Sequence, residues 1–123
     1  MEKMNVKPAT GKLGVLCVGL GAVTSTFMTG VLMARKGLAK PVGSMTQYDK
    51  MRVGRGENKK YLHYGEIVPL ANLNDIVFGA WDVYPANAYE SAVNAEVLQE
   101  KDILPVKEEL EKIVPMKAAF DHN

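Results

Sequence analysis

The sequence predicts an α/β fold: a Rossmann-like parallel sheet with flanking helices, of which this chain supplies an incomplete part. Three observations lead to this prediction. An apolar run of strand length, residues 12–18, turns at Gly19 and Gly21 and continues into an apolar helix. A second apolar run of strand length follows at 76–81, and further helical segments come after it. Strands that alternate with helices in this way are typical of a parallel sheet.

The first elements follow from the spacing of the apolar residues. Residues 1–11 are polar and irregular, so we expect a flexible N-terminal lead-in. Residues 12–18 show no alternation of polar side chains, which favours a central parallel strand that is covered on both faces. Residues 22–36 repeat apolar side chains at helical spacing, and Gly37 suits the C-cap. The chain therefore opens as a strand, a glycine turn and a helix.

Residues 40–74 follow no clear period, because Gly54, Gly56 and Gly65 interrupt them. A structureless stretch of this length is unusual inside a compact domain, so we expect a functional insertion or short helices that the pattern does not reveal. Basic residues outnumber acidic ones between positions 35 and 60. Such a segment suits phosphate or nucleic acid, although it is more often a solvated loop.

Regular structure resumes at residue 76. Residues 76–81 read as a second buried strand that ends on Asp82. A helix is predicted over 86–100, and Pro105 suits the first position of another helix over 106–114. The tail after that helix predicts no element. Because two strands alone make an unstable sheet, we expect this chain to be the first portion of something larger.

The cysteine content and the apolar stretches of the sequence indicate in which cellular compartment the protein lies. The 123 residues carry a net charge of +1 and one cysteine, Cys17, so no intrachain disulfide can form. The uncharged stretch 13–34 is long enough to cross a bilayer. However, its glycines and the hydroxyl run at 24–26 argue against a membrane span, and the glycine turn also interrupts the apolar region of a signal peptide. We therefore expect a cytoplasmic protein that does not enter a membrane.

Two further kinds of site are not predicted. His63 and His122 have no neighbouring carboxylate or cysteine pattern, so no metal site is expected. The basic residues are not interleaved with aromatic ones, so no nucleic-acid surface is expected. No pair of residues forms an evident acid–base or nucleophile arrangement, and no catalytic residue is predicted.

The glycine turn is typical of the start of a dinucleotide-binding unit. Gly19 would allow the tight turn, and Gly21 would let the backbone approach a phosphate. The free N–H groups of the first helical turn would point at that phosphate. The fingerprint is incomplete, because Thr24 replaces the third glycine and no acidic residue follows at the usual spacing. The pattern fits a purely structural strand-to-helix turn equally well. The candidate binding residues lie at the turn or in the first helical turn: Gly19, Gly21, Ala22, Val23 and Thr24.

Two sets of polar side chains could complete such a site. The hydroxyls of Thr24, Ser25 and Thr26 either hydrogen-bond a pyrophosphate or cap the helix. Asp82 ends a strand, and ligands of open α/β sheets bind outside the carboxyl ends of strands. Its carboxylate could therefore accept two ribose hydroxyls. The alternative is an aspartate of an ordinary surface turn before Pro85.

Three segments together resemble the N-terminal part of the myo-inositol-1-phosphate synthase family. They are the glycine turn at 18–26, the Val-Gly-Ser-Met-Thr-Gln segment at 42–47, and the Asn-Asp-Ile-Val-Phe-Gly-Ala-Trp-Asp segment at 74–82. The last is the most specific, since a strand ending Val-Phe-Gly-Gly-Trp-Asp-Ile is a hallmark of the family. The glycine loop of this chain is shorter than the loop in many members of the family. The complete chains of those members are several-fold longer than this one. The resemblance therefore covers only the N-terminal NAD-binding portion.

The resemblance implies NAD as cofactor, with residues 12–123 as a partial NAD-binding domain. Residues 19–24 would hold the pyrophosphate, and Asp82 would hold the adenosine ribose. The full-length enzyme would convert glucose 6-phosphate to myo-inositol 1-phosphate by oxidation, enolisation, aldol cyclisation and reduction, for inositol and phospholipid biosynthesis. It would be a homo-oligomer. The catalytic lysines of the family have no counterpart here, so this portion alone should be inactive. The alternative is a non-catalytic nucleotide-binding module or scaffold.

Overall fold

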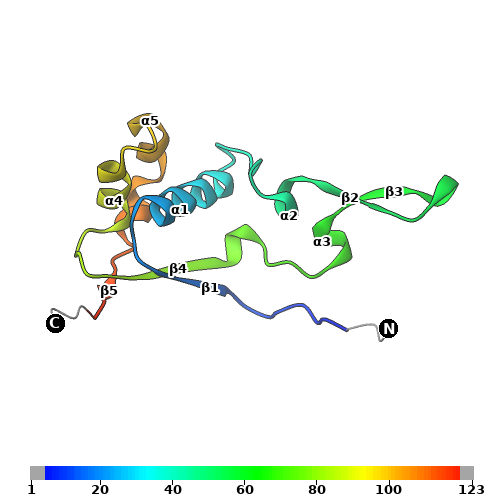
Figure 1. The fold of residues 1–123 in the computed structure, drawn as a ribbon, viewed down its shortest axis with the longest axis horizontal. Helices are drawn as coiled ribbons and strands as arrows, with labels where there is room; N and C mark the ends of the chain where they lie inside the picture. The colour runs from blue at the N-terminus through cyan, green and yellow to red at the C-terminus, as the bar shows by residue number, and fades with distance from the viewer. Residues whose placement is uncertain (1–4, 120–123) are drawn as a thin grey trace.

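Two parallel strands joined through a helix form the centre of the molecule in a computed structural model, which describes residues 5–119. The described elements, in chain order, are β1 (Leu13–Val18), α1 (Ala22–Arg35), α2 (Met45–Tyr48), β2 (Lys50–Val53), η1 (Gly56–Asn58), β3 (Lys60–His63), α3 (Tyr64–Ile67), η2 (Leu73–Asp75), β4 (Ile76–Asp82), α4 (Ala88–Ala95), α5 (Glu100–Ile103), η3 (Leu104–Val106), α6 (Lys107–Glu111) and β5 (Met116–Lys117). Figure 1 shows their arrangement.

The main sheet has the order β1–β4–β5, and both pairings are parallel. β1 and β4 pair along their whole lengths, from Leu13 opposite Ile76 to Val18 opposite Trp81. β5 extends the sheet on the other side of β4, with Met116 opposite Trp81. The prediction of a parallel sheet with flanking helices is confirmed. The tail strand β5 was not foreseen, because two paired residues are too few to give a pattern.

The helices α1, α4 and α6 pack together against one face of this sheet (Figure 1). Their contact forms a core of small and medium apolar side chains. The buried members of that core are Leu20, Met28, Leu32, Ala80, Ala88, Ala92, Ile103, Val106 and Leu110. Because Ala80 is the residue of β4 at the centre of this core, the helices fix the carboxyl end of that strand.

The expectation that residues 12–18 form a central strand covered on both faces is wrong. β1 lies at the edge of the described sheet, and β4 is its central strand. Alternate β1 residues face away from the helices: Leu16 is 60% exposed and Val18 is 90% exposed. The unbroken apolar run in the sequence thus reflects one face packed on helices and another apolar face that the described residues leave open.

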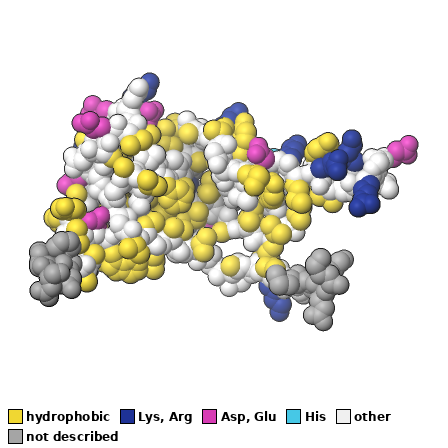
Figure 2. All heavy atoms as spheres, viewed as in Figure 1, with side chains coloured by type: hydrophobic (Ala, Val, Ile, Leu, Met, Phe, Trp, Pro, Cys, Tyr) yellow, Lys and Arg dark blue, Asp and Glu magenta, His cyan; other side chains and the backbone are white. Residues whose placement is uncertain are grey.

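The middle segment forms an arm that leaves the core and returns to it (Figure 1). β2 and β3 pair as an antiparallel hairpin, from Lys50 opposite His63 to Val53 opposite Lys60. The short helices α2 and α3 lie at its base. Of the two alternatives expected for this segment, the short helices are confirmed, and the hairpin was not predicted. Figure 2 shows Lys and Arg side chains gathered on this arm, at the far end of the molecule from the glycine turn.

Arg35, the last residue of α1, holds the returning end of this arm. Its Nε donates to the Leu73 carbonyl oxygen at 2.5 Å, and a second guanidinium N–H donates to the Ile76 carbonyl oxygen. The guanidinium carbon also lies 5.7 Å from the centre of the Phe78 ring. One side chain therefore joins the end of α1 to the start of β4.

The helices after β4 are shorter than predicted. α4 begins after Asn87, whose side chain accepts the Glu90 N–H at 2.9 Å, and ends where Glu96 adopts a left-handed backbone (φ 55°). Residues 97–99 interrupt what the sequence suggested as one helix. Pro105 lies in the short 3-10 turn η3 that leads into α6, in keeping with a helix start there. None of the described helices has the length and apolar character needed to cross a membrane.

Candidate nucleotide-binding site

The glycine turn at the end of β1 is built as the sequence suggested, with a distinct reason for each glycine. Gly19 has φ +98°, a left-handed conformation that side chains disfavour, and its N–H donates to the Trp81 carbonyl oxygen at 2.7 Å. Gly21 has φ −101°, and a Cβ built on it meets no atom within 4 Å. Neither its backbone nor its packing requires glycine, so the space beside Gly21 remains open to a ligand.

The first turn of α1 presents free backbone donors beside that space. Gly21 is the N-cap residue and supplies no side-chain cap. The N–H groups of Ala22, Val23 and Thr24 have no partner inside the helix because of their position. Ala22 and Val23 are exposed. Such a helix start favours an anion such as a pyrophosphate.

Two of the three predicted hydroxyls are used elsewhere. Ser25 is fully buried, and its Oγ donates to the Ala22 carbonyl oxygen at 3.3 Å. Thr26 donates to the same oxygen at 2.7 Å. These hydroxyls bond back along the helix, as serine and threonine often do inside helices. Neither hydroxyl therefore caps the start of the helix, and Thr24 remains the candidate of this run for a ligand contact.

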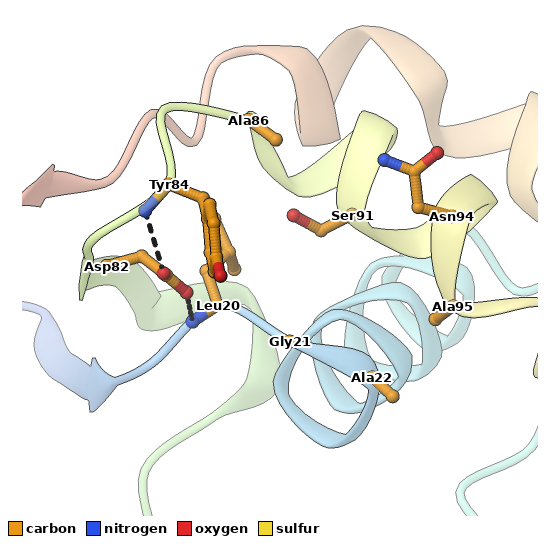
Figure 3. A pocket seen from close by; sticks show the side chains of 9 residues that line it. All are labelled: Leu20, Gly21, Ala22, Asp82, Tyr84, Ala86, Ser91, Asn94 and Ala95. Carbon is orange, nitrogen blue, oxygen red and sulfur yellow. Dashed lines mark hydrogen bonds between the residues drawn. The ribbon is translucent and has the colours of Figure 1, made fainter.

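Asp82 fastens the glycine turn to the end of β4. One carboxylate oxygen accepts the Leu20 N–H at 2.7 Å, and the other accepts the Tyr84 N–H at 3.0 Å (Figure 3). These two hydrogen bonds hold the pKa of Asp82 below its ordinary value, and the bond from the Tyr84 N–H has the larger effect. The side chain is therefore a carboxylate at neutral pH. Each carboxylate oxygen has a further lone pair, so Asp82 can still accept hydroxyls of a ribose.

The position of Asp82 explains why the fingerprint seemed incomplete. In a dinucleotide-binding unit the acidic residue stands at the end of the strand that follows the first helix. Here β2 and β3 follow α1 in the chain but form a separate hairpin, so the next strand of the main sheet is β4, the direct neighbour of β1. The arm of residues 36–75 separates the two in sequence but not in the sheet. Asp82 therefore occupies the position in space that this pattern expects for an acidic residue, at a larger distance in sequence.

A cavity of about 390 Å³ opens beside this turn, between α1 and α4 (Figure 3). It is lined by Leu20, Gly21, Ala22, Asp82, Tyr84, Ala86, Ser91, Asn94 and Ala95. Of the predicted site residues, Gly21, Ala22 and Asp82 line it, whereas Gly19, Val23 and Thr24 do not. Sequence reasoning missed Tyr84, Ser91 and Asn94, because single polar residues on a helix or loop carry no motif.

The chain forms a parallel strand–helix–strand unit with a glycine turn and a free helix start, and an aspartate ends its second strand. This arrangement defines a Rossmann-type dinucleotide-binding domain. In the described residues no group of three or more His, Cys, Asp or Glu could hold a metal ion.

Comparison with known proteins specifies the family. A model of an NAD-binding domain, described as myo-inositol-1-phosphate synthase, matches residues 13–123. The chain belongs to the myo-inositol-1-phosphate synthase family and corresponds to its N-terminal NAD-binding portion, with NAD as the cofactor.

Individual relatives agree with this assignment. An inositol-3-phosphate synthase 1 of Bacteroides thetaiotaomicron is 59% identical over 122 residues, which is 98% of this chain and 28% of the relative. The inositol-3-phosphate synthase isozyme 1 of Arabidopsis thaliana is 34% identical to this chain, over 89% of this chain and 24% of its own length. The crystal structure of the enzyme from Caenorhabditis elegans matches 94% of this chain with a TM-score of 0.79 and 26% identity, over 25% of its length. The chain thus spans about a quarter of these relatives.

Proposed function

We propose that the natural protein containing this chain is an NAD-dependent inositol-3-phosphate synthase that converts glucose 6-phosphate to myo-inositol 1-phosphate. The names of the relatives support the reaction. The observation that carries the cofactor site is the bond from Leu20 N–H to Asp82, since it holds the glycine turn and the acidic residue at one edge of the sheet. Bound NAD supplies reversible hydride transfer for a reaction without net redox change.

Within this site each part of the chain has one task. The backbone N–H groups at Gly21–Thr24 bind the pyrophosphate, and the open space at Gly21 lets it approach. Gly19 fixes the turn that aims those groups. Asp82 accepts hydroxyls of the adenosine ribose, and its charge disfavours a phosphate on that ribose. The chain thus orients NAD, while residues elsewhere in the full-length protein perform the chemistry.

Further properties belong to the same proposal. The enzyme acts in inositol and phospholipid biosynthesis, is cytoplasmic and assembles as a homo-oligomer. Residues 12–123 belong to the partial NAD-binding domain, and residues 1–4 of the predicted N-terminal lead-in lie outside the described residues. Without the substrate domain, the 123-residue chain has no synthase activity.

The test is NAD binding and turnover of glucose 6-phosphate by the complete gene product. We expect inositol phosphate to form, and Asp82→Ala to weaken NAD binding by about 1–3 kcal/mol, as for a lost hydrogen-bonded charge. Asp75→Ala is a matched control, because Asp75 is exposed and lies just before the other end of β4. NAD binding without turnover would favour the non-catalytic module, and the absence of NAD binding would remove the site.

A further inference from the structure

Helix α1 has a second apolar face, opposite the face that packs in the core. The core face carries Met28 and Leu32, which are 0% and 6% exposed. The second face carries Phe27, Gly30 and Ala34. Because these positions follow one another at helical spacing, they lie on one side of the helix, nearly opposite the core face. A helix that is apolar on both sides is normally buried on both sides.

This second face forms one wall of a cavity of about 480 Å³. Residues 39–44, at the start of the arm that leaves the C-terminal end of α1 (Figure 1), form another wall. Leu73 and Ile76 complete the apolar lining. Three polar side chains are also part of it: Lys40, Ser44 and Gln47. An apolar space of this size is rarely left empty in a native protein, because protein interiors are closely packed.

Gly30 makes the helix wall recessed, although nothing in the described residues requires a glycine there. It lies in the interior of α1, where glycine destabilises a helix relative to alanine. Its φ is not positive, and a Cβ built on it meets no atom within 4 Å among the described residues outside its own helix. The missing side chain therefore leaves room for a group from elsewhere.

The lining and the size of the cavity indicate what fills it. A sugar or a phosphate would meet mostly apolar groups and a single cation, Lys40. A second copy of the protein would need a much larger contact, because stable interfaces bury about 800 Å² on each partner. A segment of the same polypeptide associates at a lower cost in entropy, since it is already tethered. The relatives are about four times as long as this chain, which supplies such a segment.

We propose that the cavity between α1 and residues 39–44 receives apolar side chains of a segment that follows this chain in the natural protein. The backbone of that segment approaches Gly30, and Ser44 and Gln47 hydrogen-bond its polar groups. The helix that starts at the proposed pyrophosphate site is then held at its other half by the rest of the protein. The inference needs a natural protein of the relatives' length and does not depend on the NAD site.

The first test compares Gly30→Leu with Glu108→Leu in the complete gene product. A side chain at position 30 starts in open space within the described residues, so an occupant of the cavity is what opposes it. Gly30→Leu should lower the melting temperature by roughly 3–10 °C, as overpacking does. Glu108→Leu places the same side chain on an exposed position of α6 and should stay within about 2 °C. An unchanged or higher melting temperature in Gly30→Leu overturns the proposal.

Photo-crosslinking of the complete gene product identifies the occupant. A p-benzoylphenylalanine in place of Val42, which lines the cavity and is 66% exposed, should link to a peptide that follows residue 123 in the same polypeptide. The same group in place of Tyr61 is the matched control, since Tyr61 is 59% exposed on the hairpin arm and should not yield that peptide. A link from position 42 to a second copy, seen as a dimer on a denaturing gel, overturns the proposal, as does the absence of any link to a later peptide.

Discussion

At the scale of single residues, two glycines that look alike in sequence have different physical roles. Gly19 is required by the protein itself, because its backbone has φ +98°. Gly21 has an ordinary φ of −101° and open space where its side chain would be. The first glycine therefore serves the fold, and we expect the second to serve the ligand. Substitution separates these roles more cleanly than sequence can.

We predict that Gly19→Ala and Gly21→Val fail in different ways in the complete gene product. Gly19→Ala should lower the free energy of unfolding by roughly 1–2 kcal/mol, because an L-residue is strained in a left-handed conformation. Gly21→Val should leave the unfolding free energy within about 0.5 kcal/mol and abolish NAD binding, because its side chain fills the space beside the free N–H groups. Urea unfolding and calorimetric titration with NAD measure the two effects. Normal NAD affinity in Gly21→Val would contradict the assignment.

At the scale of secondary-structure elements, the sequence predicted those with strong local patterns. β1, α1 and β4 were placed within about two residues of their observed ends, because long apolar runs and the glycine turn define them. The hairpin was missed, since its outer residues carry no alternation of buried and exposed side chains: all of β2 is exposed. The turn between β2 and β3 requires a glycine at position 54, because a Cβ there would lie 2.5 Å from the Asn58 carbonyl oxygen.

The candidate site shows the same division. Residues of the glycine turn and Asp82 could be proposed from sequence because a known spacing or a strand end singles them out. Their joining could not, because the Leu20–Asp82 bond spans 62 positions and depends on β4 pairing with β1. The uses of Ser25 and Thr26 were also hidden, since a hydroxyl that bonds back along the helix and one that meets a ligand occupy the same sequence position. Tertiary pairing decides these questions.

Arg35 is the element-scale contact whose loss we expect to matter most. Arg35→Met keeps the apolar stem but removes both hydrogen bonds to the Leu73 and Ile76 carbonyl oxygens, and should lower the unfolding free energy by about 2–3 kcal/mol. Arg35→Lys should recover only part of this, because one ammonium lacks the planar fork of the guanidinium.

Urea unfolding of the complete protein measures the difference, and hydrogen exchange near residues 73–76 should accelerate in Arg35→Met. Arg52→Met is the matched control on the exposed hairpin strand β2. Equal unfolding free energies for Arg35→Met and Arg52→Met would show that the arm is held by other contacts.

At the scale of the whole molecule, the described sheet has one covered face and one open face. Helices cover one side, whereas Leu16, Val18, Val77 and Met116 remain 45–90% exposed on the other. Figure 2 shows hydrophobic side chains along this part of the body, over β1 and β4. A contiguous apolar surface on a sheet is normally covered in a native protein. The relatives are about four times as long as this chain, so they contain enough sequence to cover it.

We predict that Leu16→Lys has opposite consequences in the two settings. In the 123-residue chain, where Leu16 is 60% exposed, the charge should raise solubility and reduce binding of a hydrophobic dye. In the complete gene product it should lower the unfolding free energy by at least 2 kcal/mol, because a lysine replaces an apolar side chain that has become buried. Val97→Lys is the control, since Val97 is 58% exposed on the link between α4 and α5, away from this face. An unchanged melting temperature for Leu16→Lys in the complete protein would mean that the rest of that protein leaves the open face of β1 exposed to water.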